Sequence, residues 1–202
     1  MLGRNRTAVH YAEGVADGRR ERADAARNRV RVLAAAERLF TERGATSVSM
    51  EDVARAAGVG KGTLYRRYPD RAALAVALLD EHERRLQQRL LVGPPPLGPG
   101  AAPGERLAAF YDAMVDLLDR HLDLALAAET GSARFRTGAY GFWRAHVRVL
   151  LREAEVADPG DVLAEALLAP LAGELYQYLR ERGVSPDQIR AGLDALARRT
   201  LG

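Results

Sequence analysis

Two short apolar runs, broken by a glycine and a proline, constrain the fold of this chain more than any other feature. In residues 45–74, ATSVSMEDVARAAGVGKGTLYRRYPDRAAL, Ser49 stands three residues before Asp52, a spacing that predicts a capped helix start. Gly58 is expected to end this helix. The turn that follows needs a left-handed backbone, which a Cβ would oppose and which glycine adopts freely. A second helix from Lys61 is stopped by Pro69. The segment therefore predicts two short helices joined by a tight turn.

The composition predicts helices in the rest of the chain as well. Of 202 residues, 48% are hydrophobic, and unbranched side chains dominate over β-branched and aromatic ones, which favours helices. Apolar residues recur at steps of three and four, so we expect an all-α fold of about nine helices. The expected ranges are 27–44, 49–58, 61–68, 71–91, 105–121, 122–129, 140–156, 161–182 (kinked by Pro170) and 186–201.

Composition and charge divide the chain into three parts. Residues 1–26 contain glycines and few large apolar residues, so we expect a flexible N-terminal arm. Residues 27–72 form a predicted helix-turn-helix domain, with the motif at about 49–68, and residues 73–202 a larger helical domain. Basic residues outnumber acidic ones ten to five over 27–71, whereas fifteen face eighteen over 72–202. This asymmetry fits a nucleic-acid partner for the first domain, although a solvated surface could also produce it.

The spacing of the two short helices matches a helix-turn-helix motif, in which the second helix enters the major groove of DNA. On that second helix Leu64 and Tyr68 are expected to face inward. The residues left for the duplex are Lys61, Thr63, Arg66 and Arg67. Lys61 is the only lysine in the chain, which agrees with a contact to bases or phosphates, and chance placement is the alternative.

Over residues 29–75 the chain resembles the TetR family of transcriptional regulators. The motifs that carry the resemblance are Phe40 and Gly44, Met50 to Ala54, Ala57 to Val59, Gly62 to Tyr65, and Tyr68 to Leu74. Gly60 departs from the pattern, since the family often has Ser or Thr as the cap at this position; a glycine cap costs only a few tenths of a kcal/mol. The resemblance implies contacts to double-stranded operator DNA from Ser49, Lys61, Gly62, Thr63, Tyr65, Arg66, Arg67 and Arg71, with Ser49, Tyr65 and Arg71 on phosphates.

For the C-terminal domain the resemblance implies a pocket for a small-molecule effector. Aromatic and soft side chains gather in its middle helices, as they do in apolar ligand sites. The candidate lining residues are Phe110, Met114, Phe135, Trp143 and His146. An ordinary hydrophobic core is the alternative for each of them.

The closing helices are expected to form a homodimer interface. Their leucines recur by four and three, which suits a four-helix bundle made with a second copy. The candidate interface residues are Leu163, Leu167, Leu171, Leu175, Leu179, Ile189, Leu193 and Leu196. Packing of the same residues within one subunit is the alternative.

Other classes of function find little support in the sequence. The absence of cysteine excludes disulfides, thiolate metal sites and cysteine nucleophiles. Gly60 to Thr63 looks like the end of a P-loop, but Arg55 stands where that motif needs a glycine. The four histidines have no partner at metal-ligand spacing, and no catalytic motif is recognisable, so we expect neither an enzyme, a cofactor nor a metal site.

These observations together predict a DNA-binding transcriptional regulator. We expect a cytoplasmic, ligand-responsive repressor that binds a palindromic operator as a dimer and has no membrane segment, since no apolar run approaches 20 residues. The alternative is a helical small-molecule-binding or interaction protein without operator control.

Overall fold

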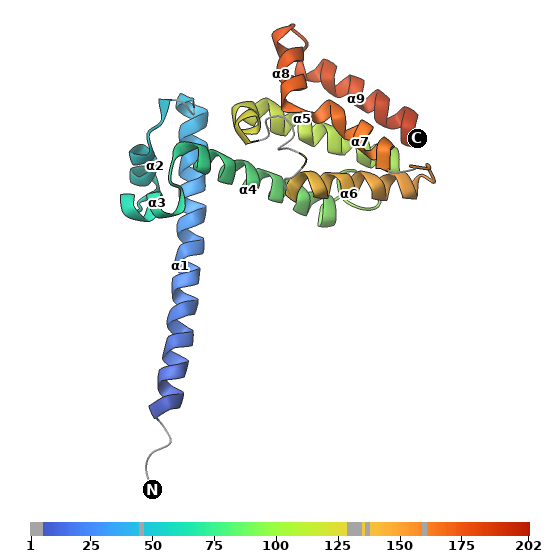
Figure 1. The fold of residues 1–202 in the computed structure, drawn as a ribbon. Helices are drawn as coiled ribbons and strands as arrows, with labels where there is room; N and C mark the ends of the chain where they lie inside the picture. Colours follow the sequence, from blue (N-terminus) through green and yellow to red (C-terminus); the bar gives the residue numbers. More distant parts are fainter. Residues whose placement is uncertain (1–5, 45–46, 129–134, 136–137, 159–160) are drawn as a thin grey trace. The chain divides into compact units, whose positions relative to one another are not determined.

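The structure, a computed structural model, describes residues 6–44, 47–128, 135, 138–158 and 161–202. These residues form helices and no strands, which confirms the all-α prediction. The elements are α1 (Arg6–Arg43), α2 (Met50–Ala57), α3 (Lys61–Arg67), α4 (Arg71–Val92), α5 (Pro103–Ala128), α6 (Gly138–Glu153), α7 (Val162–Leu168), the 3-10 helix η4 (Ala169–Leu171), α8 (Gly173–Glu181) and α9 (Pro186–Leu201) (Figure 1). The chain divides into two compact units, Met1–Leu74 and Ala75–Gly202.

Unit 1 is held together by a small core of α1, α2 and α3. Leu33, Ala36 and Leu39 follow one another at steps of three on α1 and are buried. Val53 of α2 and Leu64 of α3 are each only 1% exposed. Burying such side chains stabilises a domain by about 1.5–3 kcal/mol each. This core fixes α3 to α2, so it also sets the direction in which the opposite face of α3 points.

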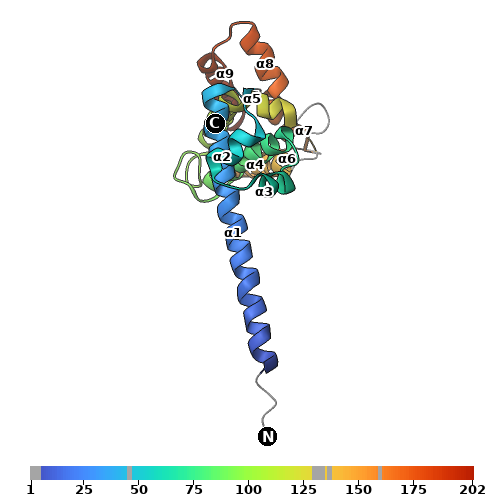
Figure 2. The same ribbon diagram turned by 90° about the vertical axis from the view of Figure 1, so that its left-hand side faces the viewer.

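The first helix is longer than the sequence predicted. It begins at Arg6, not near Arg27, and its N-terminal part extends beyond α2 and α3 (Figures 1 and 2). Gly14 and Gly18 lie inside it. Each glycine costs about 1 kcal/mol relative to alanine, but glycine, unlike proline, leaves the helical hydrogen bonds intact. The predicted start was wrong because it weighed these glycines too heavily.

Unit 2 is built around α5 and α9, which pack side by side (Figure 1). Phe110 and Tyr111 of α5 are fully buried, as is Ala197 of α9. The Tyr111 hydroxyl donates to the carbonyl oxygen of Leu167 over 2.8 Å, which ties α5 to α7. Inside the long helix α5, His121 has a non-helical backbone (φ −136°, ψ 30°), so the predicted helices 105–121 and 122–129 correspond to the two sides of this kink.

The predicted single helix over residues 161–182 is wrong, because the chain forms α7, η4 and α8 there. Pro170 lies in η4 and has no amide hydrogen to continue the helical ladder, and Ala172 is extended (φ −66°, ψ 130°). The sequence predicted a kink, but the structure has a break. The last helix is confirmed: α9 starts after Ser185, whose hydroxyl accepts from the Gln188 amide in a capping box. None of the described helices combines the length and apolar character that crossing a bilayer requires.

Candidate nucleic-acid interface

The start of α2 is fixed by a reciprocal pair of side-chain contacts. The Ser49 hydroxyl accepts from the Asp52 amide over 3.1 Å, and the Asp52 carboxylate accepts from the Ser49 amide over 3.3 Å. The Ser49 hydroxyl and backbone amide together lower the pKa of Asp52, so this carboxylate is charged at neutral pH. The capping box predicted from the sequence is confirmed, and Ser49 is exposed at the start of α2.

The turn between α2 and α3 depends on Gly58 and on a residue of α1. Gly58 is left-handed (φ 61°, ψ 41°), as the sequence predicted. The Arg31 guanidinium donates to the carbonyl oxygen of Gly58 over 2.8 Å, and a Cβ on Gly58 would lie 2.5 Å from the same nitrogen. Arg31 therefore clamps the turn to α1. Sequence analysis missed it, because no local pattern links residues so far apart in the chain.

The face of α3 opposite the core carries most of the predicted DNA contacts. Leu64 (1% exposed) and Tyr68 (4%) point into unit 1, as expected. The exposed residues on α3 are Lys61, Gly62, Thr63, Tyr65, Arg66 and Arg67. Arg71, at the first position of α4, is also exposed. Four cationic side chains thus lie within eleven residues around one short helix, and their contacts to DNA remain predictions.

One acidic side chain of α2 reaches this basic face. The Glu51 carboxylate accepts a hydrogen bond from the Tyr65 hydroxyl over 3.2 Å, and its Oε1 lies 3.6 Å from the Lys61 Nζ. The backbone amide of Glu51 lowers the pKa of its own carboxyl, and Tyr65 and Lys61 add to this effect. The pKa of Tyr65 is raised by partial burial and by Glu51. The sequence analysis did not identify Glu51. Its only local signal is that an acidic residue in the first turn of a helix is stabilising.

In unit 2 four of the five predicted effector-pocket residues form a closed core. Phe110, Met114, Trp143 and His146 are buried, with ring centroids 5.6 Å apart between Phe110 and Trp143 and 5.3 Å apart between Phe110 and His146. Met114 and Trp143 line a cavity of about 20 Å³, against the ~300–1,000 Å³ of ordinary ligand sites. Phe135 is 56% exposed and contacts Tyr140, so it does not join this group.

A larger hollow lies elsewhere in unit 2, along α5, α9 and the Pro-rich loop before α5. Its volume is about 760 Å³, and its wall of small residues includes Ala108, Ala109 and Ala191. Arg190 in this wall pairs with Asp112 over 2.9 Å, and Arg198 pairs with Asp194 over 2.9 Å. Sequence analysis missed this groove, because alanines spaced along two helices do not by themselves indicate a pocket.

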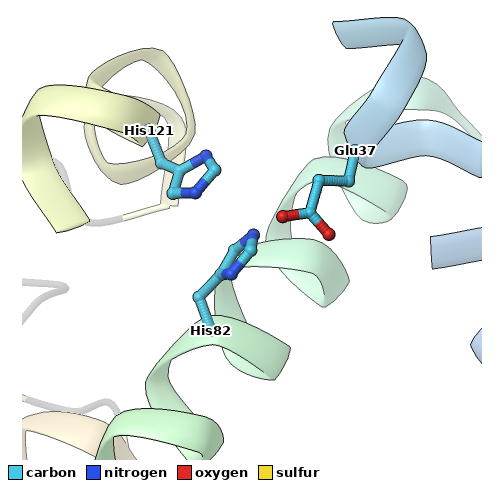
Figure 3. A group of neighbouring side chains, drawn as sticks. All are labelled: Glu37, His82 and His121. Carbon is cyan, nitrogen blue, oxygen red and sulfur yellow. The ribbon is translucent and has the colours of Figure 1, made fainter. Parts of the chain in front are cut away.

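Two histidines of unit 2 lie together at the kink of α5. The rings of His82 on α4 and His121 stack with centroids 4.0 Å apart, and Figure 3 shows both imidazoles. Burial lowers the pKa of His121 to about 4, and His82 adds to the effect, because two imidazolium ions this close repel. Spacing in the sequence did not indicate this pair, since the two residues come from different helices.

A third histidine, His146, is expected to make the stability of the protein dependent on pH. Burial lowers its pKa to about 4, with Arg106 adding to the effect, and its Nε2 has no hydrogen-bond partner among the described residues. Below pH 6.5 the His146 imidazole therefore binds a proton in the unfolded chain but stays neutral in the folded one. The free energy of unfolding consequently falls as the pH drops from about 6.5 toward 4. We expect His146 to contribute a loss on the order of 1–2 kcal/mol between pH 7.5 and pH 5.

Urea unfolding of the wild type and of His146→Leu at these two pH values measures this contribution. Leucine fills similar space in an apolar site and does not titrate. The variant is expected to lose less stability on acidification than the wild type. Equal losses in the two proteins would show that His146 does not change its protonation on unfolding.

The predicted dimer-interface leucines do not form one stripe, because α7, η4 and α8 are separate elements. Leu167, Leu171, Ile189 and Leu193 are buried within a single chain, which leaves little of these side chains for a partner. Leu163, Leu179 and Leu196 are partly exposed, and Leu175 is 40% exposed. Tyr178, which the sequence analysis did not include, is 53% exposed on the same helix as Leu175.

Comparison with known proteins agrees with the geometry of unit 1. Residues 32–78 match the family described as bacterial regulatory proteins, tetR family. Over 62 residues the chain is 45% identical to an uncharacterized HTH-type transcriptional regulator of Mycobacterium tuberculosis. That match spans 31% of each chain, so the curated relatives resemble this protein over about a third of their length.

Solved structures match over most of the chain. A TetR transcriptional regulator from Rhodococcus sp. RHA1 has a TM-score of 0.63 at 23% identity, covering 88% of this chain and 97% of that one. NalD, the secondary repressor of the MexAB-OprM multidrug efflux pump in Pseudomonas aeruginosa, has a TM-score of 0.54 at 26% identity, covering 88% and 97%. The helix-turn-helix, the matched domain and the shared fold agree: residues 32–78 form a DNA-binding domain of the kind found in bacterial regulatory proteins of the tetR family, and the chain shares the fold of solved TetR-family regulators.

Proposed function

We propose that this protein is a transcriptional repressor that binds operator DNA through α3. The observation that carries the proposal is the outward face of α3, where Lys61, Arg66 and Arg67 are exposed while Leu64 anchors the helix from behind. A rigid turn and a capped α2 hold this face in place, as the recognition helix of a DNA-binding domain (its reading head) requires. NalD, which is named a repressor and is 26% identical over nearly its whole length, supports repression over activation.

We further propose that the protein binds DNA as a homodimer. Two reading heads about 34–36 Å apart can enter successive major grooves, so a two-fold protein would match a palindromic site. Leu175 and Tyr178 expose apolar surface on α8, and the partly exposed Leu179 adds to it. This side of α8 is the proposed centre of the dimer contact, in place of the long leucine stripe expected from the sequence.

A small-molecule effector is proposed to act through unit 2. The cavity beside Met114 and Trp143 is too small for a metabolite, so an effector that enters there has to push α5 and α6 apart. A ligand that binds the enlarged state better by a few kcal/mol would shift the population toward it. Release from the operator then requires only that this state binds DNA less well.

Selection of DNA from a random duplex pool tests the proposed function. The purified protein is expected to enrich an inverted repeat and to bind it with two chains per duplex, at least about 1,000-fold more tightly than non-operator DNA. Mass measurement of the protein alone and of the complex gives the stoichiometry. Recovery of no enriched sequence would contradict operator binding and favour a helical interaction protein, and one chain per duplex would contradict the dimer.

A further inference from the structure

The acidic side chain of Glu51 stands within the basic face that we propose to meet DNA. Glu51 lies in the first turn of α2, and its carboxylate contacts Tyr65 and Lys61, which are four residues apart on α3. Residues with this spacing lie on the same side of a helix, one turn apart. One carboxylate therefore spans a full turn of the recognition helix and engages two of the side chains expected to contact DNA.

The contacts of Glu51 are the ones that DNA would need. Tyr65 has one hydroxyl hydrogen, so it cannot donate to a phosphate while it donates to Glu51. Lys61 has three donors and can serve both, but the nearby carboxylate cancels its charge locally. Glu51 itself repels phosphate. A phosphate that approaches this part of the face meets one restrained hydroxyl and one neutralised cation.

This arrangement affects non-operator DNA and operator DNA unequally. Binding to non-operator DNA comes almost entirely from cations on phosphates, so a carboxylate among them weakens it directly. Operator binding also draws on base-edge contacts, which the carboxylate does not oppose and in which carboxylates themselves accept from cytosine. The penalty is therefore largest where no base contacts compensate for it.

We propose that Glu51 is a specificity-determining residue that disfavours non-operator DNA by holding Tyr65 and Lys61. It increases the ratio of operator to non-operator affinity, and it does so by lowering non-operator affinity. The inference rests on the proposed DNA-binding function and adds a role for α2, which is otherwise the support of the recognition helix.

Fluorescence anisotropy titrations of wild type and Glu51→Gln test this role. Glutamine keeps the shape and can still accept from Tyr65, but it removes the charge. On a mixed-sequence duplex we expect Glu51→Gln to bind about 3- to 10-fold more tightly than wild type for each bound chain, with a log–log salt slope more negative by up to about one unit per chain. On the duplex recovered by selection the gain should be smaller, so the affinity ratio falls.

A matched control removes a different acidic charge from unit 1. Glu42 of α1 is exposed and pairs with Arg38 over 4.0 Å, and Glu42→Gln changes the net charge by the same amount. This control is expected to leave the affinity ratio unchanged. An unchanged or increased ratio in Glu51→Gln, or an equal fall in Glu42→Gln, would overturn the proposal for Glu51. If wild type binds neither duplex, it is the proposed function itself that fails.

Discussion

Replacing both Lys61 and Arg66 with alanine is expected to weaken operator binding by about 30- to 100-fold for each bound chain, which is about 1,000- to 10,000-fold for two chains on one duplex. Both residues are exposed on α3, and each lost contact to a base or phosphate costs on the order of 1–1.5 kcal/mol, where 1.4 kcal/mol is a factor of ten. Loss of two phosphate contacts in each of the two chains would also flatten the log–log salt slope by about four units. Anisotropy titrations at several salt concentrations measure both effects.

A double variant with the same loss of charge isolates the role of position. Arg84 and Arg85 on α4 are exposed and pair with acidic residues of their own helix, so Arg84→Ala with Arg85→Ala removes two cations from unit 2. This control should change operator affinity by less than about threefold, since distant exposed charges are screened. Both double variants should unfold like the wild type, because surface changes are usually within ±0.5 kcal/mol. A similar loss in the two variants would show that net charge, and not the face of α3, carries binding.

Phe110→Ala is expected to lower the free energy of unfolding by about 3–5 kcal/mol. Phe110 is fully buried, and its ring packs against Trp143 and His146, so alanine leaves a cavity in the centre of unit 2. Urea unfolding followed by circular dichroism, at one fixed protein concentration, gives the change. The chain has a single tryptophan, so the fluorescence of Trp143 reports on the same region.

Phe135→Ala provides the comparison for this core residue. Phe135 is 56% exposed and its truncation should cost less than about 1 kcal/mol. Both phenylalanines were predicted to line one pocket. Comparing the stability losses of the two variants therefore shows whether each residue belongs to the packed core. A loss below about 1 kcal/mol for Phe110→Ala would mean that this region is loosely packed and already able to open for a ligand.

The sequence predicted those features whose causes are local. Ser49 caps α2 from three residues away, Gly58 permits the turn by its own backbone, and Pro69 stops α3 directly. Each of these signals acts within one helical turn, so it can be read without knowing the fold. The same applies to Ser185 and α9. The proposed reading head was accessible from the sequence for this reason.

The features that the sequence did not predict depend on contacts between distant segments. The clamp from Arg31 to Gly58 joins α1 to the turn after α2, and the stack of His82 on His121 joins α4 to α5. Leucines continue at steps of four across Pro170, yet the chain breaks there, and two of them, Leu167 and Leu171, are buried within one subunit. Hydrophobic periodicity indicates which residues are apolar on one face, but not which neighbour covers that face.

The most direct test of the central claim uses the absence of native cysteine. A Thr63→Cys variant places one thiol in the middle of the exposed face of α3, and Ala191→Cys places one on α9 in unit 2. The rate of alkylation of each thiol is measured with and without the selected duplex. Operator DNA is expected to slow alkylation at position 63 by at least about tenfold while leaving position 191 unchanged, because a helix inserted in the major groove is shielded from solvent. Equal rates at position 63 with and without bound DNA would contradict recognition by α3.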